Sequence, residues 1–235
     1  RSLNANLRVG KVKNIQNLIN FSMIKINNEL MRSEAINILS NWKSPSLHDR
    51  VDGRYRGEIN RNDEIIVDLF SEKLIKLIND DSKLVRISSI KALSILKINI
   101  ANEILLSFLK NDQSSDIRKQ SLITLLENNS YKSKNIIFKI ASNDSSELVR
   151  TELLKYISLT DISNDQKTNF LINIYKKGTI KEKQESINQL KFIENDKSKK
   201  FFKNLLDGLI AESIIPEIRL EIYESLKYFK DYKIK

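Results

Sequence analysis

Three stretches of the sequence decide the fold: NDDSKLVR at residues 79–86, NDQSSDIR at 111–118 and NDSSELVR at 143–150. They are evenly spaced, and each begins with Asn-Asp and ends with a β-branched residue followed by Arg. Apolar residues follow each Arg four and seven positions later, which places them on one face of a helix. Another apolar helical stretch precedes each pattern. The sequence therefore predicts a tandem array whose unit is a helix, a short polar turn and a second helix.

The composition also favours helices. The chain has 235 residues but only five Gly and two Pro, the residues that the many tight turns of sheet proteins use. It has no Cys, which excludes disulfides, cysteine zinc ligands and CxxCH haem attachment within this chain. No run of 18 apolar residues occurs, so we expect no membrane span.

Less regular copies of the unit extend the array on both sides. The second helices of six units are headed by Arg32, Arg86, Arg118, Arg150, Lys183 and Arg219. This pattern resembles HEAT repeats over most of the chain. The resemblance implies an all-α fold, a right-handed α-solenoid of about six HEAT-like helix pairs in a single domain over residues 1–235. Stacked neighbours in such an array bury the apolar faces that one pair alone leaves exposed.

The repeated acidic and basic residues have an expected structural role. Asp80, Asp112 and Asp144 come just before the second helix, where a carboxylate can accept backbone N–H bonds and suits the helix dipole. By resemblance to HEAT units, the arginines one turn later reach the Asp of a neighbouring repeat and form a ladder; they are Arg86, Arg118 and Arg150. A row of arginines that binds anions is the alternative, but charge partners at the same period favour the ladder. Glu182 and Glu185 are interpreted as ordinary solvated helix charges.

One interruption breaks the period. Arg32 and Arg86 lie much further apart than Arg86 and Arg118, and the excess lies in an insertion loop at about residues 42–62. The loop holds the only Trp, the only His, one of the two Pro and two of the five Gly. Long loops in compact domains are often functional.

Three interpretations of the loop compete. In the first, the loop is structured and either packs Trp42 and Tyr55 on the first helix pairs or docks another domain. In the second, it binds a ligand or anion through Arg50, Arg54 and Arg56. The first is favoured.

The third interpretation is catalysis through His48 and Asp49. A triad also needs a positioned nucleophile, and metal sites usually need three or more ligands. One His in a chain without Cys offers neither, so we predict no catalytic, cofactor-binding or metal-binding residues and no enzyme activity in this segment.

A narrower resemblance rests on the loop. Its W-x-x-P-x-x-x-D-R-V-x-G-x-Y-R pattern is carried by Trp42, Pro45, Asp49, Arg50, Val51, Gly53, Tyr55 and Arg56. The segment resembles bacterial membrane-bound dehydrogenase-like proteins, in which a sorbosone/glucose-dehydrogenase-like propeller precedes HEAT repeats and a c-type cytochrome domain follows. The resemblance implies a fragment of a larger periplasmic or membrane-associated protein that oxidises a sugar or alcohol and passes electrons to haem. Neither the propeller nor a CxxCH motif lies in this sequence, so we expect no cofactor in this segment.

The sequence thus predicts a non-catalytic scaffold for protein–protein or interdomain contacts. The candidate docking loop comprises Trp42, Pro45, Asp49, Arg50, Gly53, Arg54, Tyr55 and Arg56. The net charge of +10 suggests an alternative, a nucleic-acid-binding HEAT-like protein with a basic surface. Since the basic residues are mostly interspersed with acidic ones, we expect a protein or an adjacent domain as the partner, and a monomeric segment.

Overall fold

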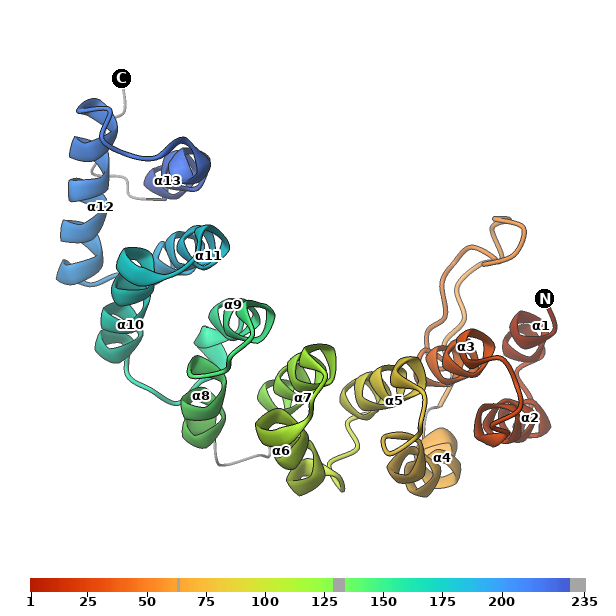
Figure 1. Ribbon diagram of the computed structural model, residues 1–235. Helices are drawn as coiled ribbons and strands as arrows, with labels where there is room; N and C mark the ends of the chain where they lie inside the picture. Colours follow the sequence, from red (N-terminus) through yellow and green to blue (C-terminus); the bar gives the residue numbers. More distant parts are fainter. Residues whose placement is uncertain (63, 129–133, 229–235) are drawn as a thin grey trace. The chain divides into compact units, whose positions relative to one another are not determined.

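A computed structural model describes residues 1–62, 64–128 and 134–228 (Figure 1). Within these ranges the chain forms 13 α-helices, two short 3₁₀ helices and no strand, so the predicted all-α class is confirmed. An isolated β-bridge joins His48 and Tyr55. The chain divides into two compact units, residues 1–132 and 133–235. The single domain expected over residues 1–235 stays a prediction.

Unit 1 is built of paired helices. They are α1 (Ser2–Val9), α2 (Val12–Met23), α3 (Glu29–Ser40), α4 (Glu64–Leu77), α5 (Lys83–Ile95), α6 (Asn102–Asn111) and α7 (Ser115–Glu127). Helix α2 packs against α3, α4 against α5, and α6 against α7. Helices α1, α3, α5 and α7 also contact one another in succession, and α2 contacts α4. Ile36, Phe70, Ile90 and Leu122 are fully buried between them.

Unit 2 repeats this arrangement of pairs. Its elements are α8 (Lys134–Ser142), α9 (Glu147–Lys155), η1 (Ile157–Leu159), α10 (Asn164–Lys177), α11 (Ile180–Leu190), α12 (Asp196–Ile210), η2 (Pro216–Ile218) and α13 (Arg219–Leu226). The pairs are α8 with α9, α10 with α11, and α12 with α13, and α11 contacts both α9 and α13. Leu171, Ile187, Phe202 and Leu226 lie in one apolar core.

The repeated Asn-Asp turn has the same geometry in its three copies. The Oδ1 atom of Asp80 accepts the backbone N–H of Ser82 at 2.9 Å. Asp112 does the same for Ser114 at 2.9 Å, and Asp144 for Ser146 at 2.8 Å. These serines are the N-cap residues of α5, α7 and α9. The aspartates therefore bind the N–H groups of the N-cap residues and fix the turn that precedes each helix. They do not cap the first N–H groups inside the helix.

Candidate docking loop

The insertion loop leaves α3, projects from the helices and returns to α4 (Figure 1). Its outer part, residues 47–56, forms a hairpin. The Asp49 N–H donates to the carbonyl of Arg54 at 2.8 Å, and the Arg56 N–H donates to the carbonyl of Leu47 at 2.8 Å. Gly53 turns the chain with a φ of 72°, a value that residues with a Cβ rarely adopt. We call residues 47–56 the hairpin below.

Trp42 anchors the base of the loop. Its side chain is only 2% exposed, and the Arg61 guanidinium carbon lies 4.7 Å from the centre of its ring. Arg61 also donates to the carbonyl of Leu7 in α1 at 2.7 Å, and its N–H donates to the carbonyl of Lys43 at 2.9 Å. Trp42 and Arg61 thus hold together the two chain segments that enter and leave the loop.

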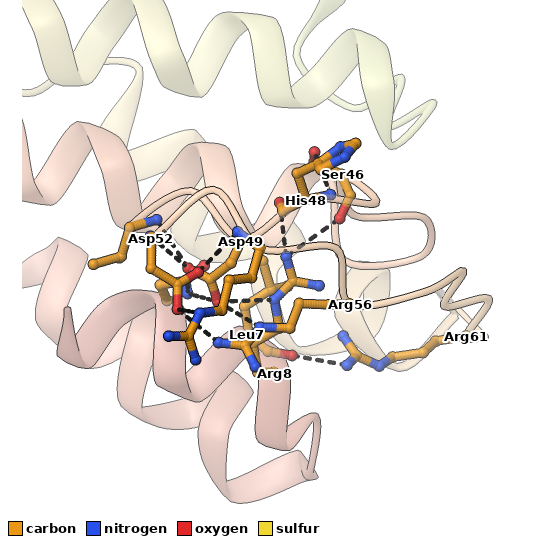
Figure 2. Close-up of polar contacts among 11 residues, drawn as sticks. Leu7, Arg8, Ser46, His48, Asp49, Asp52, Arg56 and Arg61 are labelled. Carbon is orange, nitrogen blue, oxygen red and sulfur yellow. Dashed lines mark hydrogen bonds and ion pairs between the residues drawn. The ribbon is translucent and has the colours of Figure 1, made fainter.

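Asp49 is the second anchor (Figure 2). It is 7% exposed and accepts the Val51 N–H at 2.8 Å and the Asn4 side-chain amide at 3.0 Å. The Arg56 Nε lies 3.4 Å from its Oδ2 atom. The pKa of Asp49 lies below its ordinary value, chiefly because of the hydrogen bond from the Val51 N–H. Burial opposes this change, but hydrogen bonds from Asn4 and the Asp52 N–H and the charge of Arg56 also lower the pKa. The carboxylate therefore stays ionised at neutral pH and holds the inner end of the hairpin.

Helix α1 fastens the hairpin from its side. The Arg8 Nη2 atom donates to the carbonyls of Ser46 at 3.2 Å and His48 at 3.0 Å, and its Nε lies 3.7 Å from Asp49 (Figure 2). Asn4 contributes the amide described above. The role of these α1 residues could not be predicted from the sequence, because α1 lies outside the repeated pattern and carries no motif.

The three loop arginines lie near carboxylates of α3 and of the hairpin. Arg50 pairs with Glu34 of α3 at 2.9 Å. Arg56 pairs with Asp52 at 2.9 Å, and Arg54 approaches the same carboxylate at 3.8 Å while its side chain stays 77% exposed. Each arginine already has a carboxylate nearby, so this geometry does not favour the anion-binding interpretation.

Apolar and aromatic side chains are exposed on the hairpin. Leu47 is 44% exposed, Val51 48% and Tyr55 68%. The His48 ring packs edge-on against Tyr55 at a centroid distance of 5.8 Å. The neighbouring Asp49 carboxylate accepts hydrogen bonds from Asn4 of α1 and from the Val51 N–H of the hairpin. Pro45, the remaining residue of the predicted loop set, is buried near the base.

Arginine–carboxylate contacts join successive helix pairs within each unit. The Arg32 Nη2 atom lies 2.6 Å from Asp80, with both side chains buried. Arg86 donates to Asp112, and the Arg150 Nε lies 2.7 Å from Glu182. In each case the arginine of one pair reaches the acid of the next pair along the chain.

Arg86, Arg118 and Arg150 also donate to backbone carbonyls that precede their own helices. Arg86 donates to the carbonyl of Ile78 at 3.1 Å, Arg118 to that of Asp112 at 2.8 Å, and Arg150 to that of Asp144 at 2.8 Å. The Asp144 carboxylate also accepts the Ser146 N–H within this turn. Each arginine therefore fixes the polar turn before its own helix.

The interpretation of Glu182 as a solvated charge is wrong. Glu182 is 3% exposed, accepts the Arg150 Nε and accepts the backbone N–H of Thr179 at 2.9 Å. Burial raises the pKa of Glu182, but these hydrogen bonds and the Arg150 charge outweigh it, so the pKa lies below its ordinary value. Glu182 thus pairs with the arginine of the preceding helix pair, as Asp80 and Asp112 do. It differs from these aspartates in that it lies inside a helix, whereas they lie in the turn before a helix.

The described ranges contain no group of three or more His, Cys, Asp or Glu residues arranged to hold a metal ion. In the same ranges, no helix is long and apolar enough to cross a membrane. Comparison with models of known protein families and with curated proteins gives no match for this chain.

Proposed function

We propose that the chain is a non-catalytic scaffold whose six helix pairs are HEAT-type units of one right-handed solenoid. Three observations support this proposal. The Asn-Asp pattern recurs at even spacing along the sequence, the helices pack in pairs within each unit, and arginine–carboxylate contacts link successive pairs. Repeat arrays of this kind offer extended surfaces to partners.

The hairpin is the proposed docking element, because its base is fixed while side chains on its outer part are exposed. Its base is fixed by Trp42, Asp49 and Arg61, whereas Arg54 and Tyr55 are exposed. Tyr and Arg are enriched among the residues that dominate binding energies. A loop that is already ordered loses less conformational entropy when it binds. A protein surface, rather than a small ligand, suits such a projecting element.

The partner in this proposal is an adjacent domain of a larger, dehydrogenase-like redox protein. The support is the resemblance of the loop motif, whose Trp42, Asp49 and Gly53 determine the shape of the hairpin. In that setting the segment supplies spacing and contacts, and the redox chemistry belongs to other domains.

Site-specific photo-crosslinking tests the docking proposal. A photoreactive benzoylphenylalanine is placed at Tyr55 of the protein in its native cells, and at Tyr223 as a control, which is 48% exposed in the other unit. We expect position 55 to give one defined protein adduct, or one intramolecular adduct with an adjacent domain, that position 223 does not give. The adduct is identified by mass spectrometry.

The captured protein or domain is then purified for affinity measurements. The double substitution Arg54→Ala and Tyr55→Ala should weaken binding about tenfold or more, because it removes two exposed anchor side chains. A matched control, Lys176→Ala with Tyr223→Ala, should leave affinity unchanged. Equal affinity of both double variants would reject the hairpin as the docking element, and salt-sensitive crosslinking to nucleic acid would favour the basic-surface alternative.

A further inference from the structure

Unit 2 contains a cavity of about 470 Å³ at one end of the α9, α10 and α11 helices. Its volume lies within the range of small-ligand pockets, about 300–1,000 Å³. It is lined by the end of α9, by η1, by the first turn of α10, by the last turn of α11 and by the segment that follows α11. The residues that matter most below are Lys155, Ser158, Lys167, Gln189, Phe192 and Ile193.

Lys167 is the unusual member of this lining. It is 9% exposed, and its Nζ atom donates to the carbonyl of Ser158 at 3.3 Å. Burial lowers the pKa of Lys167, and the charge of Asp161 opposes this change only in part. An ammonium group has three N–H donors, so one long hydrogen bond leaves donor capacity that an anion could use.

The rest of the lining divides into polar and apolar parts. Lys155 adds a second ammonium group, which also contacts Glu152 at 3.2 Å, and Gln189 adds an amide that donates to Glu185 at 2.8 Å. Phe192 and Ile193 supply the apolar wall. No Asp or Glu is among the residues that line the cavity within the described part of the chain.

We infer that this cavity binds a carboxylate attached to a small apolar group, with the carboxylate at Lys167 and the apolar part against Phe192 and Ile193. A charge-assisted hydrogen bond from an ammonium to a carboxylate is about twice as strong as a hydrogen bond between neutral groups. A bare phosphate would leave the apolar wall unused. Two sources have this chemistry, a free short-chain carboxylic acid and the C-terminal residue of a peptide with an apolar side chain.

The test titrates the full chain with hexanoate, with a pentapeptide that ends in leucine, and with the same peptide amidated at its C-terminus. Binding is followed by calorimetry and by the NMR signals of 13C-labelled lysine side chains. We expect hexanoate or the free-acid peptide to bind and to shift the Lys167 signal, while the amidated peptide does not bind. Binding of hexanoate alone identifies a free acid as the source, and binding of the free-acid peptide identifies a C-terminus.

Lys167→Met provides the decisive variant, because it keeps the apolar stem and removes the charge. Affinity should fall about 10- to 100-fold, the usual contribution of a hydrogen bond to a charged group. Lys176→Met, at the exposed far end of the same helix, should bind normally. Phe192→Ala provides a second variant on a 62% exposed residue and should also weaken binding. Absence of binding by both carboxylates, or unchanged affinity of Lys167→Met and Phe192→Ala, would overturn the inference.

Discussion

Trp42 lies on the segment that enters the insertion loop, and Arg61 of the returning segment places its guanidinium over the Trp42 ring. Asp49 and Asp80 are likewise buried and held by groups distant in the sequence, Asn4 for the first and Arg32 for the second. Buried charges are tolerated only when they are paired and hydrogen-bonded. At the residue scale, therefore, a few side chains determine whether the hairpin and the repeat contacts form.

Trp42→Ala should lower the free energy of unfolding by about 3–5 kcal/mol, the usual cost of removing a buried aromatic side chain. Arg61 would lose the ring beneath it as well. Urea unfolding followed by circular dichroism measures the change, and Tyr55→Ala serves as the control because Tyr55 is 68% exposed. A loss below about 1 kcal/mol would mean that Trp42 does not anchor the loop.

Asp80 gives a prediction about pH. Burial alone would raise the pKa of Asp80. Hydrogen bonds from Arg32 and from the Ser82 N–H, together with the Arg32 charge, have the larger effect, so the pKa lies below its ordinary value. Because the folded-state pKa lies below the unfolded value of about 3.9, this stabilisation is fully present above about pH 5 and is lost as the pH falls through the folded-state pKa.

Asp80→Asn should therefore destabilise the chain at pH 7, by about 3 kcal/mol for a broken buried pair, and by clearly less at pH 3. Urea unfolding of the native chain and the variant at both pH values measures the difference. Asp81→Asn is the matched control, because the side chain of Asp81 is 84% exposed. An equal effect of Asp80→Asn at both pH values would show that the charge of Asp80 is not the cause.

At the element scale, the helices were predictable and the hairpin was not. The repeated pattern and the scarcity of Gly and Pro indicate the helices, because both reflect local backbone preferences and periodic burial. The hairpin depends on Asn4, Arg8 and Arg61, whose contacts join segments that are distant in the sequence. The burial of Glu182 could not be predicted for the same reason, since its partner Arg150 lies in the preceding helix pair.

Gly53 gives the prediction for the hairpin. A Cβ at this position would meet no atom within 4 Å, so the positive φ of 72° is the only obstacle to a side chain. Gly53→Ala should destabilise the closed hairpin by about 1–2 kcal/mol, whereas Gly53→Asn should cost less because Asn adopts this conformation more readily. Amide hydrogen exchange at Asp49 and Arg56, whose N–H groups close the hairpin, measures the effect. Unchanged exchange in Gly53→Ala would contradict the proposed turn.

At the scale of the whole molecule, the sequence period continues from Arg118 to Arg150, the heads of the repeats on either side of the division between the two units. We propose that this period reflects one solenoid, which carries the hairpin as a docking element. A single solenoid requires one defined distance between the two units. A distance measured from one unit to the other therefore tests whether the two units form one solenoid.

Pulsed dipolar EPR between spin labels at Lys91→Cys in α5 and Lys155→Cys in α9 tests this claim most directly. The chain has no native Cys, and the two lysines occupy equivalent positions in helices separated by two repeat periods. Asn37→Cys with Ile123→Cys, from α3 to α7 inside unit 1, is the reference pair. One solenoid predicts a narrow distribution at about 20 Å for both pairs, since neighbouring helices pack about 8–10 Å apart. A narrow reference distribution with a broad or much longer Lys91–Lys155 distribution would contradict the account.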